Sequence, residues 1–235
     1  MLRISSVMTK TSDVDLPFDT LLDLVQRHTI RYFIEACDPT SKLPYDRLNR
    51  DGTSPNGIIS IGGCGFAVMA IVVAVSRGWM NRSDAVERVL LMLNALSKVE
   101  RFHGAFPHFI HAGSLKTCSF SRYDDCGDLV ETALLLQGLL SARAFFDRDE
   151  GWETKLRACV SDINDAVEWN WYASRHTRPT LYWHWSPTHR WKKNIPITGW
   201  NEALIAYVLA AGAEAFPIDP QAFHIGWTNE RRFLN

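Results

Sequence analysis

The sequence predicts an all-α fold in which helical hairpins form an inner and an outer ring. Strongly apolar helical segments alternate along the chain with amphipathic ones, and long loops precede the apolar segments. A helix that is apolar on all sides must be buried, whereas an amphipathic helix belongs on an outer layer. Strands and helices do not alternate in the pattern of a parallel sheet. The alternation of the two kinds of helix therefore indicates two layers of helices.

Three helices are predicted before the first long aromatic loop. Apolar side chains recur with a helical period from Phe18 to Cys37. A polar loop, Asp38 to Gly57, leads to the segment Gly62-Gly-Cys-Gly-Phe66, which opens an almost wholly apolar helix ending near Gly78. This second helix is expected to be buried. Asn81 begins a third helix with apolar residues on one side only, which is expected on the outer layer.

The same order is then repeated. A polar and aromatic loop, Phe102 to Cys126, precedes a strongly apolar helix, Gly127 to Phe146, and an amphipathic helix from about Trp152 to Trp169. Another loop, Trp171 to Gly199, precedes a further apolar helix, Trp200 to Ala213. The pattern thus predicts six long helices.

Composition and charge are those of an ordinary globular protein. The 235 residues carry a formal net charge of −1, and 46% of them are hydrophobic. Nucleic acids and anionic membrane surfaces attract basic proteins, so neither is expected as a partner. Met1 to Pro17 lacks the apolar core of a secretory signal, and the longest apolar run, Phe66 to Val75, is too short to span a bilayer. We therefore expect a cytoplasmic protein, with residues 1–16 as a disordered extension and residues 17–235 as one domain.

Cysteines and glycines give no indication of a cofactor. The five cysteines are scattered and form no Cys-x-x-Cys pair, so they are expected to be reduced packing residues rather than a disulfide framework or a zinc site. Gly62 to Gly65 lacks both the Lys-Ser/Thr ending of a phosphate-binding loop and the GxGxxG spacing. Nucleotide binding is therefore not expected.

Four carboxylates gather where a loop becomes the helix that starts near Gly127. Asp128 and Glu131 lie within one turn on one face of that helix, while Asp124 and Asp125 precede it. Like charges this close raise at least one pKa, which keeps one carboxylic acid protonated beside an ionised one and suits acid/base chemistry. The alternative is helix capping, with Asp125 as the N-cap residue and Asp128 at N3.

An aromatic loop offers a second candidate site. Seven of the nine tryptophans fall in a stretch that ends at Trp200, and Trp183, His184 and Trp185 lie in its loop. Indole rings stack on sugars while polar neighbours bind hydroxyl groups, although packing of the loop onto the helices is an equal alternative. Glu202 stands at the mouth of the next apolar helix, where the helix dipole alone would favour it. Carboxylates at two helix mouths, with an aromatic loop between them, are what glycoside hydrolysis requires.

Six motifs in order resemble the bacterial glucoamylase-like family, which includes β-1,2-glucanases and has a similar domain in cyclic β-1,2-glucan synthases. The resemblance runs from about Leu21 to Trp227. The motifs are Arg31-Tyr-Phe33, Ile61-Gly-Gly-Cys-Gly-Phe-Ala-Val-Met-Ala70, Arg101-Phe-His-Gly-Ala-Phe-Pro-His108, Asp124-Asp-Cys-Gly-Asp-Leu-Val-Glu-Thr-Ala133 with Gln137-Gly-Leu-Leu140, Tyr182-Trp-His-Trp-Ser-Pro187 and Gly199-Trp-Asn-Glu202. The resemblance implies an (α/α)6 toroid, inverting hydrolysis of a β-glucan with a β-1,2-linked glucan as the expected substrate, and chemistry without a metal or cofactor.

The resemblance also implies roles for particular residues. Asp124, Asp128, Glu131 and Glu202 match acidic family positions that line the sugar cleft. Glu202 is predicted to be the general acid, with Asp128 and Glu131 orienting the substrate or sharing the proton. The predicted substrate-binding residues are Trp183, His184, Trp185, Trp200, Asn201, His108 and Arg47. An oligo- or polysaccharide is the predicted partner.

The chain departs from the family pattern in two respects. Cys126 stands where the family's acidic run has a glycine. In addition, an (α/α)6 toroid has twice as many helices as the six predicted here, so we expect a truncated member without its second half and without the opposing catalytic base. Hydrolysis would then be impaired, and an exposed apolar edge would favour self-association. A non-catalytic glucan-binding protein or a relic is the alternative, and family members are often exported.

The acidic run also permits a second enzyme class. Asp124-Asp-Cys-Gly-Asp128 has the Asp-Asp-x-x-Asp form with which terpene cyclases hold magnesium against a diphosphate. The second metal motif of such cyclases needs Asn-Asp followed by Ser or Thr and then Glu. Asn164-Asp165 is followed at those places by Glu168 and Tyr172, so the second motif is absent.

Overall fold

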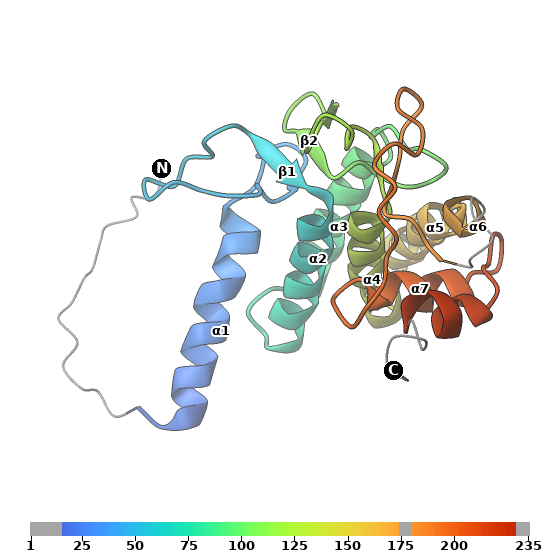
Figure 1. The fold of residues 1–235 in the computed structure, drawn as a ribbon. Helices are drawn as coiled ribbons and strands as arrows, with labels where there is room; N and C mark the ends of the chain where they lie inside the picture. The colour runs from blue at the N-terminus through green and yellow to red at the C-terminus, as the bar shows by residue number, and fades with distance from the viewer. Residues whose placement is uncertain (1–15, 174–179, 229–235) are drawn as a thin grey trace.

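Helices dominate the computed structural model, which describes residues 16–173 and 180–228 (Figure 1). The extension predicted at residues 1–16 lies outside the described residues except for Leu16. The α-helices of the described chain are α1 (Phe18–Glu35), α2 (Ile61–Ser76), α3 (Arg82–Leu96), α4 (Leu129–Phe145), α5 (Gly151–Asp165), α6 (Trp169–Ala173) and α7 (Leu204–Ala211). Its strands are β1 (Ile58–Ser60), β2 (Phe109–His111), β3 (Thr117–Cys118), β4 (Gly127–Asp128) and β5 (His184–Trp185), and a π-helical turn, Phe223–Trp227, follows α7.

The apolar and amphipathic helices pack in the order that the sequence predicts. The apolar helices α2 and α4 share the most extensive contact between described helices, and the apolar α7 also packs on α4. The amphipathic helices α3 and α5 pack on each other, and α1 packs on α2 (Figure 1). The apolar helices thus lie side by side in the interior, as expected from burial of all-round apolar surface.

Two glycines allow α2 and α4 to approach closely. A Cβ atom on Gly65 would lie 2.7 Å from the Cα atom of Leu135, and one on Gly138 would lie 2.7 Å from the carbonyl carbon of Gly65. Both separations are well below a normal contact between carbon atoms. The backbone N–H of Gly62 also bonds to Glu131, so the two helices run in the same direction with their N-terminal ends together.

Short strand pairs shape the loops above these helix ends. β1, β2 and β3 form an antiparallel sheet, and β4 pairs with β5 so that Asp128 lies opposite His184. This second pairing keeps Gly127 and Asp128 extended, so α4 begins at Leu129 rather than at the predicted Gly127. Similarly, α7 begins at Leu204 rather than Trp200, because turns occupy the residues between them.

One large hydrophobic core holds the packed helices together, but the start of α1 lies outside it. Phe18, Leu21 and Val25 are 75%, 48% and 54% exposed, and Ile30 is the buried residue of this helix. None of the described helices combines the length and the apolarity that a membrane span requires. The first turns of α1 therefore present an apolar surface without a partner in the described chain.

Candidate functional site

Asp128 is the central residue of the candidate site. Its side chain is fully buried, and its two oxygens accept four hydrogen bonds. Oδ1 accepts from the backbone N–H groups of Val130 (3.0 Å) and Glu131 (2.9 Å), which makes Asp128 the N-cap residue of α4. Oδ2 accepts from Nε1 of Trp183 and Nδ1 of His108, each at 2.8 Å. The same carboxylate therefore caps a helix and orients two side chains.

The capping hypothesis predicted the wrong N-cap residue for α4. It placed Asp125 there and Asp128 at N3, but the paired strand β4 keeps the chain extended as far as Asp128. Asp125 instead lies in the loop, where its Oδ1 is 3.7 Å from Nε2 of His184. We use the name acid cluster below for Asp124, Asp128, Glu131 and His108.

Glu131 lies beside His108 where α2 and α4 begin. Its Oε2 accepts the backbone N–H of Gly62 at 2.6 Å, and its Oε1 is 3.9 Å from Nε2 of His108. Burial raises the pKa of Glu131 above its ordinary value, and the negative charge of Asp128 raises it further. Burial alone would lower the pKa of His108. The pKa is nevertheless raised, because His108 bonds to Asp128 and lies near the negative charges of Asp128, Glu131 and Asp124. Glu131 therefore retains a proton more readily than an exposed glutamate, as the spacing of the carboxylates predicted.

Asp124 is held in an ion pair at the edge of the acid cluster. It is 4% exposed, its Oδ2 is 3.1 Å from Nζ of Lys193, and its Oδ1 is 3.7 Å from Nε2 of His184. That nitrogen of His184 accepts the backbone N–H groups of Asp125 (3.1 Å) and Cys126 (3.3 Å). Since burial also lowers the pKa of His184, the imidazole is neutral and braces the acidic loop. Burial raises the pKa of Cys126 to about 12, so the residue that replaces the expected glycine stays a thiol.

The two tryptophans of the aromatic loop have different surroundings. Trp183 is partly exposed and donates its indole N–H to Asp128. Trp185 is 7% exposed, and its ring makes edge contacts with His103 at 4.7 Å and Trp171 at 5.8 Å between centroids. Packing accounts for Trp185, whereas Trp183 has open surface beside the acid cluster.

Three of the predicted site residues lie in the turns just before α7. Glu202 is exposed and makes no hydrogen bond or ion pair with any residue that the structure describes. Trp200 is 66% exposed and contacts the ring of Trp227 at 6.4 Å between centroids. Asn201 bonds locally, its Oδ1 accepting the backbone N–H of Ala203 at 3.0 Å. The role of Glu202 as general acid stays a prediction.

Two residues near the acid cluster carry no signal in the sequence. Asp46 lies close enough for its charge to raise the pKa of Glu131, and its Oδ2 is 2.9 Å from Nε of Arg47. The exposed Arg47 side chain, predicted to bind substrate, is thus paired with a residue near the acid cluster. Phe120 places its ring centroid 4.5 Å from that of His108. Both Asp46 and Phe120 are single residues of irregular loops, where no periodic pattern marks them.

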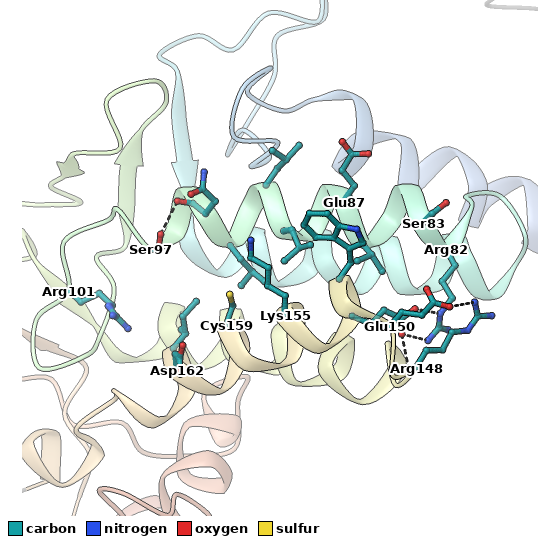
Figure 2. Close-up of a pocket in the computed structure, with 18 residues that line it drawn as sticks. Arg82, Ser83, Glu87, Ser97, Arg101, Arg148, Glu150, Lys155, Cys159 and Asp162 are labelled. Atoms are coloured by element: carbon teal, nitrogen blue, oxygen red, sulfur yellow. Dashed lines mark hydrogen bonds and ion pairs between the residues drawn. The ribbon is translucent and has the colours of Figure 1, made fainter.

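A groove of about 980 Å³ lies between α3 and α5 and shares no lining residue with the acid cluster (Figure 2). At one end Arg82 donates to Glu153 at 2.7 Å and to Asp147 at 3.0 Å, so its charge is already paired. Arg101 lies at the other end, and the 67% exposed Trp152 belongs to the lining. Its lining includes Glu150 and Glu153 at the start of α5, but Glu153 is paired with Arg82. The acid cluster, not this groove, is the candidate catalytic site.

Comparison with known proteins finds sugar hydrolases that are similar to most of this chain. No family model matches the chain. An exo β-1,2-glucooligosaccharide sophorohydrolase (non-reducing end) from Parabacteroides distasonis is 38% identical over 216 residues, which are 92% of this chain and 29% of the relative. The chain is thus similar over most of its own length to part of a β-1,2-glucooligosaccharide hydrolase.

Solved structures of this group agree with the fold. The endo-β-1,2-glucanase from Chitinophaga pinensis, in complex with sophorotriose and glucose, matches with a TM-score of 0.87 and 38% identity over 92% of this chain and 52% of that one. A glucoamylase-like protein from Bacteroides fragilis matches with a TM-score of 0.88 and 37% identity over 94% of this chain and 53% of that one. The predicted half of an (α/α)6 toroid is confirmed, because the chain matches about half the length of these two structures.

Two observations bear on the two interpretations of the acidic run. Within residues 16–173 and 180–228, no three His, Cys, Asp or Glu side chains are grouped to hold a metal ion. The relatives reported above are named as β-1,2-glucan hydrolases and not as terpene cyclases.

Proposed function

We propose that this chain carries part of the active site of a glycoside hydrolase that acts on a β-1,2-linked glucan by an inverting acid/base mechanism. One observation carries the proposal: Glu131, with its raised pKa, lies beside the fully bonded Asp128 and His108 in a homologue of β-1,2-glucan hydrolases. The named activities of the relatives supply the substrate class.

The contacts of each carboxylate suggest its role. Inverting hydrolysis needs an acid that protonates the leaving oxygen and a base that activates water, with carboxyl groups about 6.5–9.5 Å apart. Both oxygens of Asp128 are occupied by N–H donors, and Asp124 is paired with Lys193, so these two position their neighbours. Glu202 is exposed and has no hydrogen-bond or ion-pair partner among the described residues, and the pKa of Glu131 is raised by burial, so we assign proton donation to Glu202 and proton sharing and sugar orientation to Glu131.

Release of sugar from β-1,2-glucan tests these roles. Glu202→Gln and Glu131→Gln keep the side-chain shape and remove the exchangeable proton, which should lower the rate by about 10²–10⁴-fold. Glu214→Gln, at another exposed glutamate after α7, is the matched control and should hydrolyse the glucan as the unchanged chain does. A rate within about tenfold of the unchanged chain for Glu202→Gln would remove Glu202 from the acid role.

Glucan binding without hydrolysis is the second candidate function. It is favoured by the bonding of Asp128 and Asp124, which leaves neither carboxylate free to act as the base. Calorimetric titration with sophorotriose separates the two functions. Binding without sugar release supports the binding function, binding with release supports the hydrolase, and the absence of binding contradicts both.

A further inference from the structure

Phe120 is an exposed aromatic residue at the edge of the acid cluster. Its side chain is 53% exposed, although it lies in a loop with one side of the ring packed on His108. The ring centroids of Phe120 and His108 are 4.5 Å apart, and their planes are tilted by 33°. The ring centroid of Phe109 lies 5.7 Å from that of Phe120. His108 is fixed in turn by its bond to Asp128. The Phe120 ring therefore packs against His108, a residue of the candidate site.

Backbone hydrogen bonds fix the loop that carries this ring. The N–H groups of Phe120 and Ser121 donate to the carbonyl oxygen of Asp124 at 2.8 and 3.3 Å, and the N–H of Asp124 donates back to Ser121 at 3.1 Å. Such a closed turn leaves little freedom to fold the ring into the core. Phe120 thus stays exposed because of the loop geometry.

A second loop, which contains Lys192 and Lys193, contacts the loop that carries Phe120. Nζ of Lys193 donates to Oγ of Ser121 at 3.2 Å and pairs with Oδ2 of Asp124 at 3.1 Å. Nζ of Lys192 lies 4.4 Å from the centroid of Tyr123 in the same turn. Ring and carboxylates are therefore held in one arrangement before any ligand binds, which lowers the entropic cost of binding.

An exposed apolar ring beside hydroxyl-binding groups matches one kind of ligand. A pyranose has C–H faces that stack on an aromatic ring and hydroxyl groups at its rim that bond to carboxylates and ammonium groups. Phe120 offers the ring, while Lys193, whose Nζ lies 5.7 Å from the ring centroid, and Glu131 offer polar groups in the same cluster of residues.

We propose that Phe120 is a sugar-stacking platform that binds a glucosyl unit of the glucan next to the acid cluster. The proposal rests on the proposed function, because it assumes that the acid cluster faces a glucan. It assigns a binding role to a residue of the loop between β3 and β4. Phe120 touches none of the hydrogen-bonding groups that perform the proton transfer, so its effect is on affinity rather than on the chemical step.

Calorimetric titration of the 235-residue chain with sophorotriose tests this role. Phe120→Ala removes the ring and should weaken binding about tenfold, which corresponds to about 1.4 kcal/mol. Phe120→Trp keeps a flat ring and should bind at least as tightly as the unchanged chain. Trp152→Ala, at another exposed aromatic residue, in the groove between α3 and α5, is the control and should change affinity by less than about twofold.

The possible results are separable. Thermal melting of each variant checks that the fold is kept, which is expected because Phe120 and Trp152 are both mostly exposed. Binding by Phe120→Ala within about twofold of the unchanged chain would overturn the platform and leave the hydrolase proposal standing. Loss of affinity in Trp152→Ala but not in Phe120→Ala would place the sugar in the groove and also overturn it. Failure of the unchanged chain to bind sophorotriose would overturn both proposals.

Discussion

Gly138→Ala should separate the two helices on which the acid cluster is built. The new Cβ atom would overlap the backbone of Gly65, where it lies 2.7 Å from the carbonyl carbon. Carbon atoms in normal contact are about 3.5–4.0 Å apart, so α2 and α4 must move apart by roughly 1 Å. No side-chain rotation relieves this overlap, because both partners are backbone. The N–H of Gly62, which bonds to Glu131, would move with α2.

The size of the effect follows from two opposing contributions. A gap of about 1 Å forfeits a quarter to a half of the dispersion energy along the contact, and forced overpacking typically costs about 1–3 kcal/mol. Alanine favours a helix over glycine by about 1 kcal/mol, which offsets part of this cost. We expect a net loss of about 1–2 kcal/mol in the free energy of unfolding, because the lost dispersion energy adds to the overpacking cost. For a domain of this size each kcal/mol lowers Tm by about 2–4 °C, so Tm should fall by roughly 2–8 °C.

Thermal melting with a matched glycine variant measures this loss. Gly151→Ala, at the first residue of α5, places its Cβ atom in open space and should melt at or slightly above the temperature of the unchanged chain. Sophorotriose titration of Gly138→Ala, below its Tm, should show weaker binding because Glu131 loses its fixed partner. A Tm for Gly138→Ala equal to or higher than that of Gly151→Ala would refute close backbone contact as the basis of the α2–α4 packing.

Three further outcomes follow from the contacts and charges. Asp128→Asn should lower the free energy of unfolding by about 3 kcal/mol, because an amide N–H₂ would face the N–H donors of Trp183 and His108. NMR titration should also show a lower pKa for His108 than in the unchanged chain. An unshifted pKa would contradict the assigned bond between His108 and Asp128. Folding lowers the pKa of His184, so its contribution to stability is present above about pH 6.5 and is lost as the pH falls through the folded-state pKa. The destabilisation caused by His184→Gln should therefore be smaller at about pH 5.5 than at about pH 7.5. Equal destabilisation at the two pH values would contradict a lowered pKa. The apolar start of α1 should make the chain self-associate with rising concentration, and Leu21→Lys with Val25→Lys should reduce this in sedimentation measurements, whereas a monomer at every concentration would contradict it.

The helices could be predicted because their signals are local. Almost every side of α2 is apolar, and the chain from Ile61 to Ser76 is accordingly buried over most of its length. The polar loops and the glycine after this helix marked its ends within two residues. For α4, by contrast, the first two predicted residues form β4, since their pairing with β5 depends on a segment far along the chain. Two-residue strands carry no period, so tertiary contact alone decides them.

The candidate site could be predicted in part for the same reason. Asp128 and Glu131 share a helix, so their spacing placed them together, whereas the contact of Glu131 with Gly62 joins residues 69 positions apart. Phe120 and Lys193 approach the acid cluster through loops whose course depends on the whole fold. Chemistry within one turn of a helix can be recognised from spacing, but partners supplied by other loops cannot.

Asp128 shows why capping and chemistry were not true alternatives. A carboxylate has about four lone-pair sites, and here two accept the N–H groups that open α4 while two accept Trp183 and His108. Capping fixes the carboxylate in place, and only a fixed carboxylate can hold the imidazole of His108 with its second nitrogen toward Glu131. The charge of Asp128 then raises the pKa of Glu131, which is the property that acid/base chemistry needs. The stability of the helix end and the protonation of Glu131 therefore both depend on Asp128.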